Sequence, residues 1–183
     1  MTSESAHPFH HVGVLAHPQR PETFPLADQI ARWLGERGVA TTVLTEWDQE
    51  RACAGSSAWN LVISIGGDGN VLRAARVCAA RGVPVLGVNM GRMGFLTEMS
   101  PSDWQDGLTA VLRGDYWLED RLMIAAEWWC GEDLMCREEA LNEAVVSRGA
   151  IARLVEFETY IDGAWTTTYR GDGLIVATPT GKY

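Results

Sequence analysis

An apolar segment with the pattern of a buried β-strand leads directly into a glycine-rich turn near the middle of the chain. Leu61–Ile65 reads LVISI, without the polar alternation of a half-exposed strand, and Gly66-Gly67-Asp68-Gly69-Asn70 follows at once. Strands of this kind are typical of parallel sheets that are covered by helices on both faces. We therefore expect the chain to fold around an open parallel sheet, with this turn at the carboxyl end of one strand.

Strands and helices are predicted to alternate through the first 115 residues. Apart from 61–65, we expect strands at 11–16, 39–44 and 84–88 and helices at 24–37 and 70–81, with a third helix capped by Ser100 or Ser102. The apolar faces expected to pack on the sheet are Leu26, Ile30, Trp33 and Leu34, then Leu72, Ala75 and Ala79, then Trp104, Leu108, Val111 and Leu112. This alternation implies right-handed crossovers and a mostly parallel sheet.

The pattern changes after Gly114. Residues 116–129, 154–161, 164–169 and 174–178 are strand-like, without a long helical pattern, and Asp162-Gly163 is typical of a two-residue hairpin turn. We therefore expect an α/β domain over residues 1–115 and the start of an all-β domain over residues 116–183.

Charge and composition limit the class of protein. The chain has 183 residues, a net charge of −9 and 46% hydrophobic residues. An acidic chain is unsuited to coating nucleic acid, although backbone amides can still bind a nucleotide. There is no run of about 18 apolar residues and no signal-peptide pattern, so we expect no membrane association.

Cysteines and histidines give little sign of a metal or disulfide site. Cys53, Cys78, Cys130 and Cys136 form no C-x-x-C pair, and we expect reduced, mostly buried thiols in a cytoplasmic protein. The early histidines are expected to form a solvated polar lead-in rather than a metal site: His7, His10, His11 and His17.

The turn at 66–70 is the strongest candidate for a phosphate site. Gly66, Gly67 and Gly69 allow the backbone to approach a ligand closely, and a helix start offers free N–H groups. A carboxylate repels bare phosphate, so Asp68 predicts a general base for a hydroxyl, or a carboxylate that acts through a divalent ion. The alternative is a tight turn in which Asp68 caps the helix.

Three other segments can contribute to a site. Residues 87–96 follow another strand, at the sheet edge where open α/β folds bind ligands, or they form a flexible connection. Asn142-Glu143 can bind sugar hydroxyls or form a plain turn, and Arg170 with Asp172 can form a salt-bridged turn. Neither G-x-G-x-x-G after the first strand nor a complete Walker A sequence is present.

Together these segments resemble the NAD kinase family, in its bacterial branch. The motifs are GGDGN at 66–70, GVNMGRMGFLTE at 87–98, LNEAVV at 141–146 and GDGLIVATPTG at 171–181. The resemblance implies an α/β domain followed by a β domain, with the dinucleotide bound between them. It also implies phosphorylation of the adenosine ribose 2′-hydroxyl of NAD by ATP, giving NADP, with a divalent ion such as Mg²⁺.

The resemblance further implies roles for single residues. Asp68 matches the catalytic base, and Gly66, Gly67 and Gly69 match glycines that let phosphates approach the backbone. The other matching positions are expected to bind the dinucleotide: Leu72, Phe95, Asn142, Glu143, Arg153, Arg170 and Asp172. No residue is assigned as a metal ligand, and polyphosphate stays open as an alternative donor to ATP.

Two other functions stay open. A lipid or sugar-phosphate kinase can share the GGDG turn, as diacylglycerol kinases and phosphofructokinases do. The chain can also be a non-catalytic fragment that binds dinucleotide or folds only with a partner, because family members follow TPTG with Ser-Thr-Ala-Tyr and further strands, whereas Lys182-Tyr183 stand here. We therefore expect a C-terminally truncated chain that is poorly stable and weakly active or inactive alone, and a homodimer or homotetramer for the full-length protein.

Overall fold

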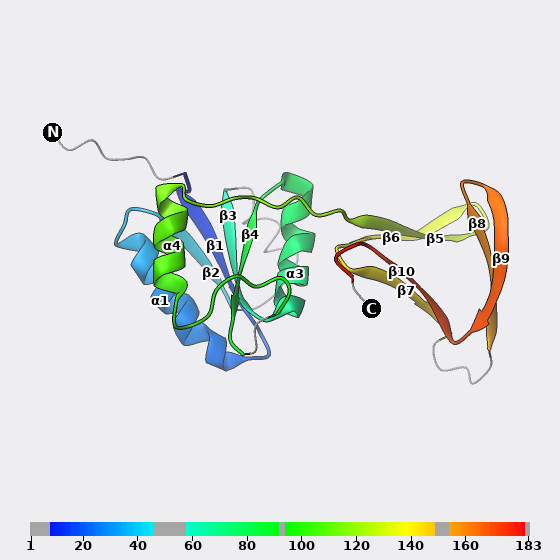
Figure 1. Ribbon diagram of the computed structural model, residues 1–183, viewed down its shortest axis with the longest axis horizontal. Helices are drawn as coiled ribbons and strands as arrows, with labels where there is room; N and C mark the ends of the chain where they lie inside the picture. Colours follow the sequence, from blue (N-terminus) through cyan, green and yellow to red (C-terminus); the bar gives the residue numbers. More distant parts are fainter. Residues whose placement is uncertain (1–7, 46–57, 92–93, 149–153, 182–183) are drawn as a thin grey trace. The chain divides into compact units, whose positions relative to one another are not determined.

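The structure is a computed structural model that describes residues 8–45, 58–91, 94–148 and 154–181. It divides into two compact units, unit 1 (Met1–Glu119) and unit 2 (Asp120–Tyr183). Unit 1 contains a parallel sheet with helices, and unit 2 contains antiparallel strands (Figure 1). The expected fold class, α/β followed by β, is therefore confirmed.

Unit 1 is built on a four-stranded parallel sheet in the order β2-β1-β3-β4. Its strands are β1 (His11–Ala16), β2 (Ala40–Leu44), β3 (Leu61–Gly66) and β4 (Val85–Asn89). In the middle of the sheet Ile63 lies opposite Val14 of β1 and Leu86 of β4. β3 is thus an internal strand and all of its residues are buried, which explains why its sequence shows no polar alternation.

Helices cover both faces of this sheet. Two of them, α1 (Phe24–Gly35) and α4 (Trp104–Arg113), lie on one face, and α3 (Asp68–Cys78) lies on the other (Figure 1). Two short 3₁₀ turns, η1 (Pro21–Thr23) and η2 (Ala79–Arg81), flank α1 and α3. Val14 packs into the core beneath α1 and α4, whereas its neighbour Leu15 packs into the core beneath α3, because successive strand side chains point to opposite faces.

The predicted apolar faces agree with the structure for α1 and α4 but not for α3. In α3, Leu72 and Ala75 are half-buried and Ala79, just beyond its end, is exposed. The residues buried there are Asn70, Val71, Ala74, Val77 and Cys78. The true face is rotated by one residue, and the small alanines of this helix made the two faces hard to distinguish in the sequence.

The predicted cap of the third helix is also wrong by a few residues. α4 begins at Trp104 and its N-cap residue is Asp103. The side chains of Ser100 and Ser102 hydrogen-bond to one another at 2.8 Å, and the Asp103 carboxylate accepts the N–H of Ser100 at 2.6 Å. The serines therefore shape the approach to the helix rather than capping it.

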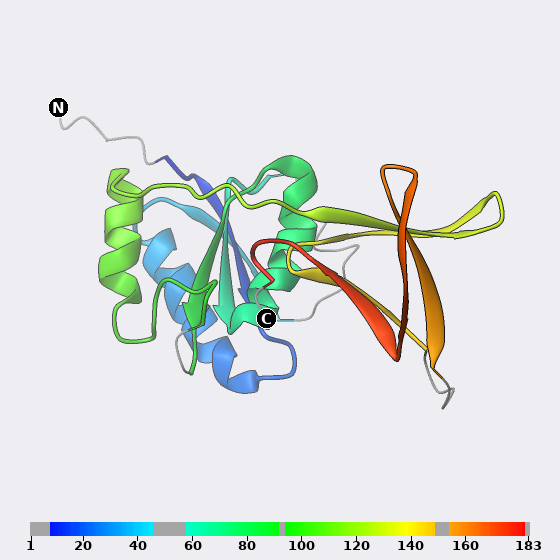
Figure 2. The ribbon, with the colours of Figure 1, turned by 45° about the vertical axis from the view of Figure 1, so that its right-hand side comes forward.

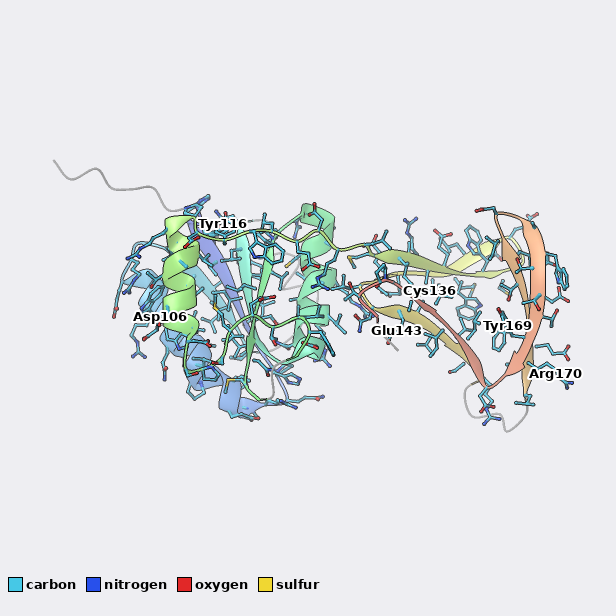
Figure 3. All side chains as sticks on the ribbon, in the orientation of Figure 1. Asp106, Tyr116, Cys136, Glu143, Tyr169 and Arg170 are labelled. Carbon is cyan, nitrogen blue, oxygen red and sulfur yellow. The ribbon has the colours of Figure 1, made fainter. Side chains whose placement is uncertain are left out.

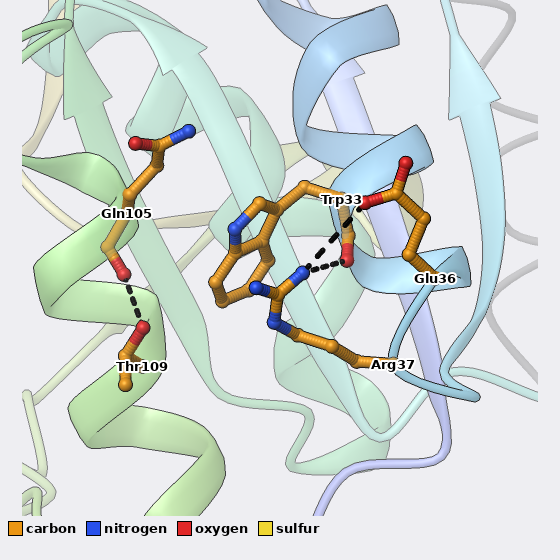
Figure 4. A network of polar contacts seen from close by, with 5 residues as sticks. All are labelled: Trp33, Glu36, Arg37, Gln105 and Thr109. Carbon is orange, nitrogen blue, oxygen red and sulfur yellow. Dashed lines mark hydrogen bonds and ion pairs between the residues drawn. The ribbon is translucent and has the colours of Figure 1, made fainter.

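Trp33 joins α1 to α4. Its ring meets the Trp104 ring edge-on, with centroids 5.7 Å apart, and the Arg37 guanidinium lies 3.7 Å from its centroid. Arg37 also donates to the Trp33 carbonyl at 2.9 Å, while Thr109 donates to the Gln105 carbonyl at 2.6 Å within α4 (Figure 4). These contacts stabilise the partly exposed edge of the helical layer.

The described residues of unit 2 form three two-stranded antiparallel sheets. They pair β5 (Ile124–Cys130) with β6 (Asp133–Ala140), β7 (Glu143–Ser147) with β10 (Gly173–Ala177), and β8 (Val155–Ile161) with β9 (Ala164–Gly171) (Figure 2). The hairpin predicted at Asp162-Gly163 is confirmed, since both residues have positive φ, 51° and 80°.

The strand predicted over residues 116–129 differs from the structure. Its strand begins only at Ile124, and it pairs with β6, which the sequence did not predict. β6 reads DLMCREEA and all its residues but the last are exposed. An exposed strand carries no requirement for apolar alternation, so its sequence gave no strand pattern.

The cysteines are less buried than expected. Cys78 is buried in α3, but Cys130 and Cys136 are exposed free thiols on β5 and β6, and Cys53 lies outside the described residues. The expectation of mostly buried thiols is therefore wrong for the pair in unit 2. The physical reason is that the described part of unit 2 has little core, and large side chains such as Trp128 and Trp165 are exposed as well.

Candidate functional site

The glycine-rich turn lies at the carboxyl end of β3. Gly66 ends the strand, Gly67 has an extended backbone (φ −133°, ψ −170°), and Asp68 begins α3. A Cβ added at Gly67 or Gly69 would meet no atom within 4 Å among the described residues. Since no neighbouring atom covers these positions, the backbone around Asp68 is open to the approach of a ligand.

The Asp68 carboxylate is held by the loop that follows β4. Its Oδ2 accepts the N–H of Phe95 at 2.9 Å, and its Oδ1 accepts the N–H of Leu96 at 3.0 Å. Both bonds reach across to another loop rather than to the helix that Asp68 begins. The two glycine-rich segments at the carboxyl edge of the sheet therefore meet at this carboxylate.

Gly94 makes this contact possible. A Cβ at Gly94 would overlap the Asp68 carboxylate. The sequence singled out the 87–96 segment, but nothing in it distinguished Gly94 from its neighbouring glycines, because the requirement comes from a contact with a residue far away in the chain.

We expect Gly94→Ala to displace the Asp68 carboxylate from the Phe95 and Leu96 amides. Amide hydrogen exchange at these two residues should speed up by about tenfold, the equivalent of one lost hydrogen bond. The matched control is Gly91→Ala, where the nearest atom to the added Cβ among the described residues is Asn89 Oδ1, at 4.0 Å. Equal exchange rates in the two variants would contradict this assignment.

Phe95 and Leu72, two apolar residues predicted for the site, lie in the same unit as Asp68. Their side chains differ in how far they are exposed to solvent. The Phe95 side chain is 81% exposed even though its N–H is bonded to Asp68, while Leu72 is half-buried in α3. An exposed aromatic ring beside an anchored carboxylate offers a flat apolar surface that suits another ring.

His17 lies at the carboxyl end of the sheet, directly after β1. Its Nδ1 accepts the N–H of Gln19 at 3.2 Å, and its own N–H donates to Thr23 Oγ1 at 3.0 Å. Burial lowers the pKa of His17 from 6.5, and the nearby guanidinium groups of Arg73 and Arg20 lower it further, while Glu22 acts in the opposite direction. His17 is thus a partly buried, neutral side chain, and not part of a solvated lead-in.

The lowered pKa of His17 predicts a pH dependence of stability. In the unfolded chain the His17 side chain has a pKa near 6.5, so it binds a proton more readily there than in the folded chain. The contribution of His17 is therefore present above pH 6.5 and is lost as the pH falls through its lower folded-state pKa. In urea unfolding of unit 1 between pH 7.5 and 5, His17→Gln should lose less stability than the parent chain. An identical decline in both would remove His17 as a cause.

In unit 2, Asn142 lies in the turn between β6 and β7, and Glu143 is the first residue of β7. Buried Thr178 holds this turn, since its N–H donates to the Asn142 carbonyl at 2.7 Å and its hydroxyl donates to the Leu141 carbonyl at 2.5 Å. A Cβ at Gly181 would lie 2.6 Å from the Asn142 carbonyl oxygen and 3.2 Å from Glu143 Oε2. The LNE and TPTG segments therefore pack against one another, a role for Thr178 that the sequence did not indicate.

Arg170 and Asp172 do not pair with each other. Arg170 Nε lies 3.2 Å from Glu156 Oε1 across the β8–β9 hairpin, and Arg148 Nη1 lies 3.3 Å from Asp172 Oδ1. The predicted salt-bridged turn is therefore wrong, because Arg170 pairs with Glu156 on the neighbouring strand and Asp172 pairs with Arg148, which follows β7. Figure 3 shows Glu143 and Arg170 well apart in unit 2. Arg153, also predicted for the site, lies outside the described residues.

Metal coordination finds little support in these side chains. Across the described parts of the chain, no group of three or more His, Cys, Asp or Glu residues lies together in a way that could hold an ion. The donor set does not fit a resident divalent ion. The helices in the described residues also include none with the length and apolar character to cross a membrane.

Two family models match the chain. The ATP-NAD kinase N-terminal domain matches residues 45–116, and the ATP-NAD kinase C-terminal domain matches residues 141–183. The first of these ranges contains the glycine-rich turn at 66–70 and the loop residues 94–96 that hold Asp68. The second contains Asn142, Glu143 and Thr178.

Individual relatives agree with the family models. The chain is 40% identical to an NAD kinase of Chloroflexus aurantiacus over 174 residues and 35% identical to one of Geobacter metallireducens over 177 residues. Each alignment covers 93% of this chain and 62% of the relative, so the chain spans less than two thirds of the length of these relatives.

A solved structure shares the fold. Yeast NADH kinase, crystallised as a complex with NADH, superposes with a TM-score of 0.83 at 20% identity, covering 96% of this chain and 59% of that one. At this identity the likeness concerns the fold alone. The fold, the two domain matches and the curated relatives together show that the chain belongs to the NAD kinase family.

Proposed function

We propose that the chain acts as an NAD kinase, which transfers the γ-phosphoryl group of ATP to the adenosine ribose 2′-hydroxyl of NAD and releases NADP and ADP. The observation that carries the proposal is the Asp68 carboxylate, held by the Phe95 and Leu96 amides beside an uncovered glycine backbone. Family membership supports the choice of substrates.

In the proposed reaction Asp68 is the general base. A carboxylate has about four lone-pair positions, so two N–H bonds leave it free to accept a third hydrogen from a hydroxyl. It takes the 2′-hydroxyl proton while the oxygen attacks the γ-phosphorus. The bond from the γ-phosphorus to the bridging oxygen breaks, and ADP leaves with that electron pair. The Phe95 and Leu96 amides fix the orientation of the Asp68 carboxylate. A base that is already oriented toward the hydroxyl increases the reaction rate.

The other matching residues are proposed to bind the dinucleotide. The glycines of the turn let phosphates approach the backbone, Phe95 and Leu72 offer apolar surface to a ring, and polar side chains bind sugar hydroxyls and phosphates. The polar set consists of Asn142, Glu143, Arg153, Arg170 and Asp172. To bind the dinucleotide, Arg170 must leave Glu156 and Asp172 must leave Arg148. Ion pairs near the surface contribute little stability, so giving them up costs little free energy.

Further parts of the proposal concern the setting of the reaction. ATP enters as its complex with a divalent ion, Mg²⁺ by preference, which offsets phosphate charge and needs no dedicated protein cage.

The proposed α/β domain spans residues 1–115 and the proposed β domain begins at 116, close to the unit boundary at Glu119. We also propose a cytoplasmic protein, in keeping with the free thiols on β5 and β6, and a homodimer or homotetramer for the full-length protein.

A radiometric assay tests this function. The chain is incubated with γ-³²P-labelled ATP and, in separate reactions, NAD, diacylglycerol or fructose 6-phosphate, with enzyme in excess so that slow turnover is detected. Labelled NADP should form, and the other two acceptors should stay unlabelled. Label on the lipid or sugar would favour the alternative kinases. Binding of NAD by calorimetry without NADP formation would favour a non-catalytic dinucleotide binder.

A further inference from the structure

Asn70, in the first turn of α3, carries a buried amide that joins the helix to two strands. The residue is 1% exposed. Its Nδ2 donates to the Leu15 carbonyl of β1 at 3.2 Å, to the Ile65 carbonyl of β3 at 2.9 Å, and lies 3.0 Å from Ser64 Oγ of β3. These contacts cross 55, five and six residues of sequence, so they fix the start of α3 to the sheet.

The chemistry of the acceptors requires an amide here. Carbonyl oxygens only accept hydrogen bonds, so the nitrogen of Asn70, and not its oxygen, must face Leu15 and Ile65. The nitrogen has two hydrogens to share among three acceptors. An aspartate of the same shape would place negative charge against two carbonyl oxygens. A serine or threonine has one hydrogen and can satisfy one acceptor at most.

The glycine turn leaves space for this side chain. A Cβ at Gly66 would lie 3.0 Å from the Asn70 Cβ and 3.3 Å from its Cγ. The Asn70 backbone N–H also donates to the Gly67 carbonyl at 2.9 Å. Asn70, which follows Asp68, is therefore bonded to the segments that precede Asp68, through its backbone to Gly67 and through its side chain to β1 and β3.

We propose that Asn70 is a positioning residue for Asp68. Its buried amide fixes the first turn of α3 to β1 and β3, and thereby holds the Asp68 carboxylate where it receives the Phe95 and Leu96 amides. The consequence for phosphoryl transfer rests on the proposed NAD kinase function. The consequence for the Asp68–loop contact does not, because that contact is a property of unit 1 itself.

Amide hydrogen exchange tests the positioning without requiring activity. In Asn70→Ser, exchange at Phe95 and Leu96 should speed up by about tenfold relative to the core strands, the equivalent of one lost hydrogen bond. Val77→Ala, which removes buried apolar volume from the same helix, is the control for general destabilisation. In Val77→Ala, amide exchange at Phe95 and Leu96 should increase no more than exchange in β1 and β3. Equal behaviour of the two variants would overturn the proposal, and if Asn70→Ser fails to fold, Asn70→Thr takes its place.

A double-mutant cycle tests the catalytic consequence. Asn70→Ser should lower kcat by about 10–100-fold, as expected for a base displaced by up to about 1 Å, with a much smaller change in KM for NAD. Combined with Asp68→Asn, it should cost little further, because it acts through a base that is already absent. Equal losses in both backgrounds would overturn the proposal. If no variant or parent forms NADP, the proposed function fails, and the exchange experiment alone decides the role of Asn70.

Discussion

Replacing Asp68 with asparagine is expected to lower the turnover of NAD to NADP by about 10²–10⁴-fold. The amide has almost the same shape as the carboxylate but cannot take the 2′-hydroxyl proton. It can also accept from only one of the two loop amides, because its nitrogen is a donor. The affinity for NAD should change much less, since the other proposed contacts remain. Single-turnover kinetics and calorimetry, measured separately, distinguish the two effects.

The matched control is Asp106→Asn on α4. Asp106 is an exposed carboxylate in the first turn of that helix (Figure 3), so the substitution makes the same chemical change without touching the GGD turn. It should leave turnover unchanged. Near-parent turnover in Asp68→Asn would remove Asp68 from the role of base.

A second large effect is expected in the core of unit 1. Ile63 lies in the middle of β3 and is 0% exposed, packed in the cluster beneath α1 and α4. Ile63→Ala removes three buried carbon atoms and leaves a cavity, which should lower the free energy of unfolding by about 2–5 kcal/mol. Because the chain has two units, the measurement is hydrogen exchange of the β1 and β3 amides, which follows unit 1 alone.

Val145→Ala provides the comparison in unit 2. Val145 is 59% exposed on β7, so its truncation should alter the stability of unit 1 by less than about 0.5 kcal/mol. If Ile63→Ala changed exchange in β1 and β3 as little as this control does, β3 would not be the central buried strand described above.

The fold of unit 1 was predictable because buried parallel strands leave a strong pattern. LVISI at 61–65 corresponds to β3, whose side chains are buried on both faces of the sheet, so its sequence shows no polar alternation. The sequence was less informative where burial is incomplete. β6 is exposed, so its charged sequence carried no strand pattern, and in α3 small residues on adjacent faces concealed which face packs on the sheet.

The candidate site divides in the same way. The sequence makes Asp68 a candidate because a carboxylate in a glycine-rich turn repels bare phosphate and so suggests another role. Its partners at Phe95 and Leu96, and the roles of Asn70 and Thr178, depend on acceptors and donors far away in the sequence. Local pattern alone does not give such contacts. Arg170 and Asp172 illustrate the same point, because Glu156 and Arg148, which lie elsewhere in the chain, replace the local pair that their spacing predicted.

The most direct test of the central claim is the position of the transferred phosphate. The product made from NAD and ATP by the parent chain is isolated and its phosphorus–proton couplings are measured by NMR, with Asp68→Asn treated in parallel. The account predicts a phosphate on the 2′-oxygen of the adenosine ribose in the parent reaction, and a product yield at least about 10²-fold lower in the variant. Phosphate on another oxygen, or the same yield from both proteins, would contradict it.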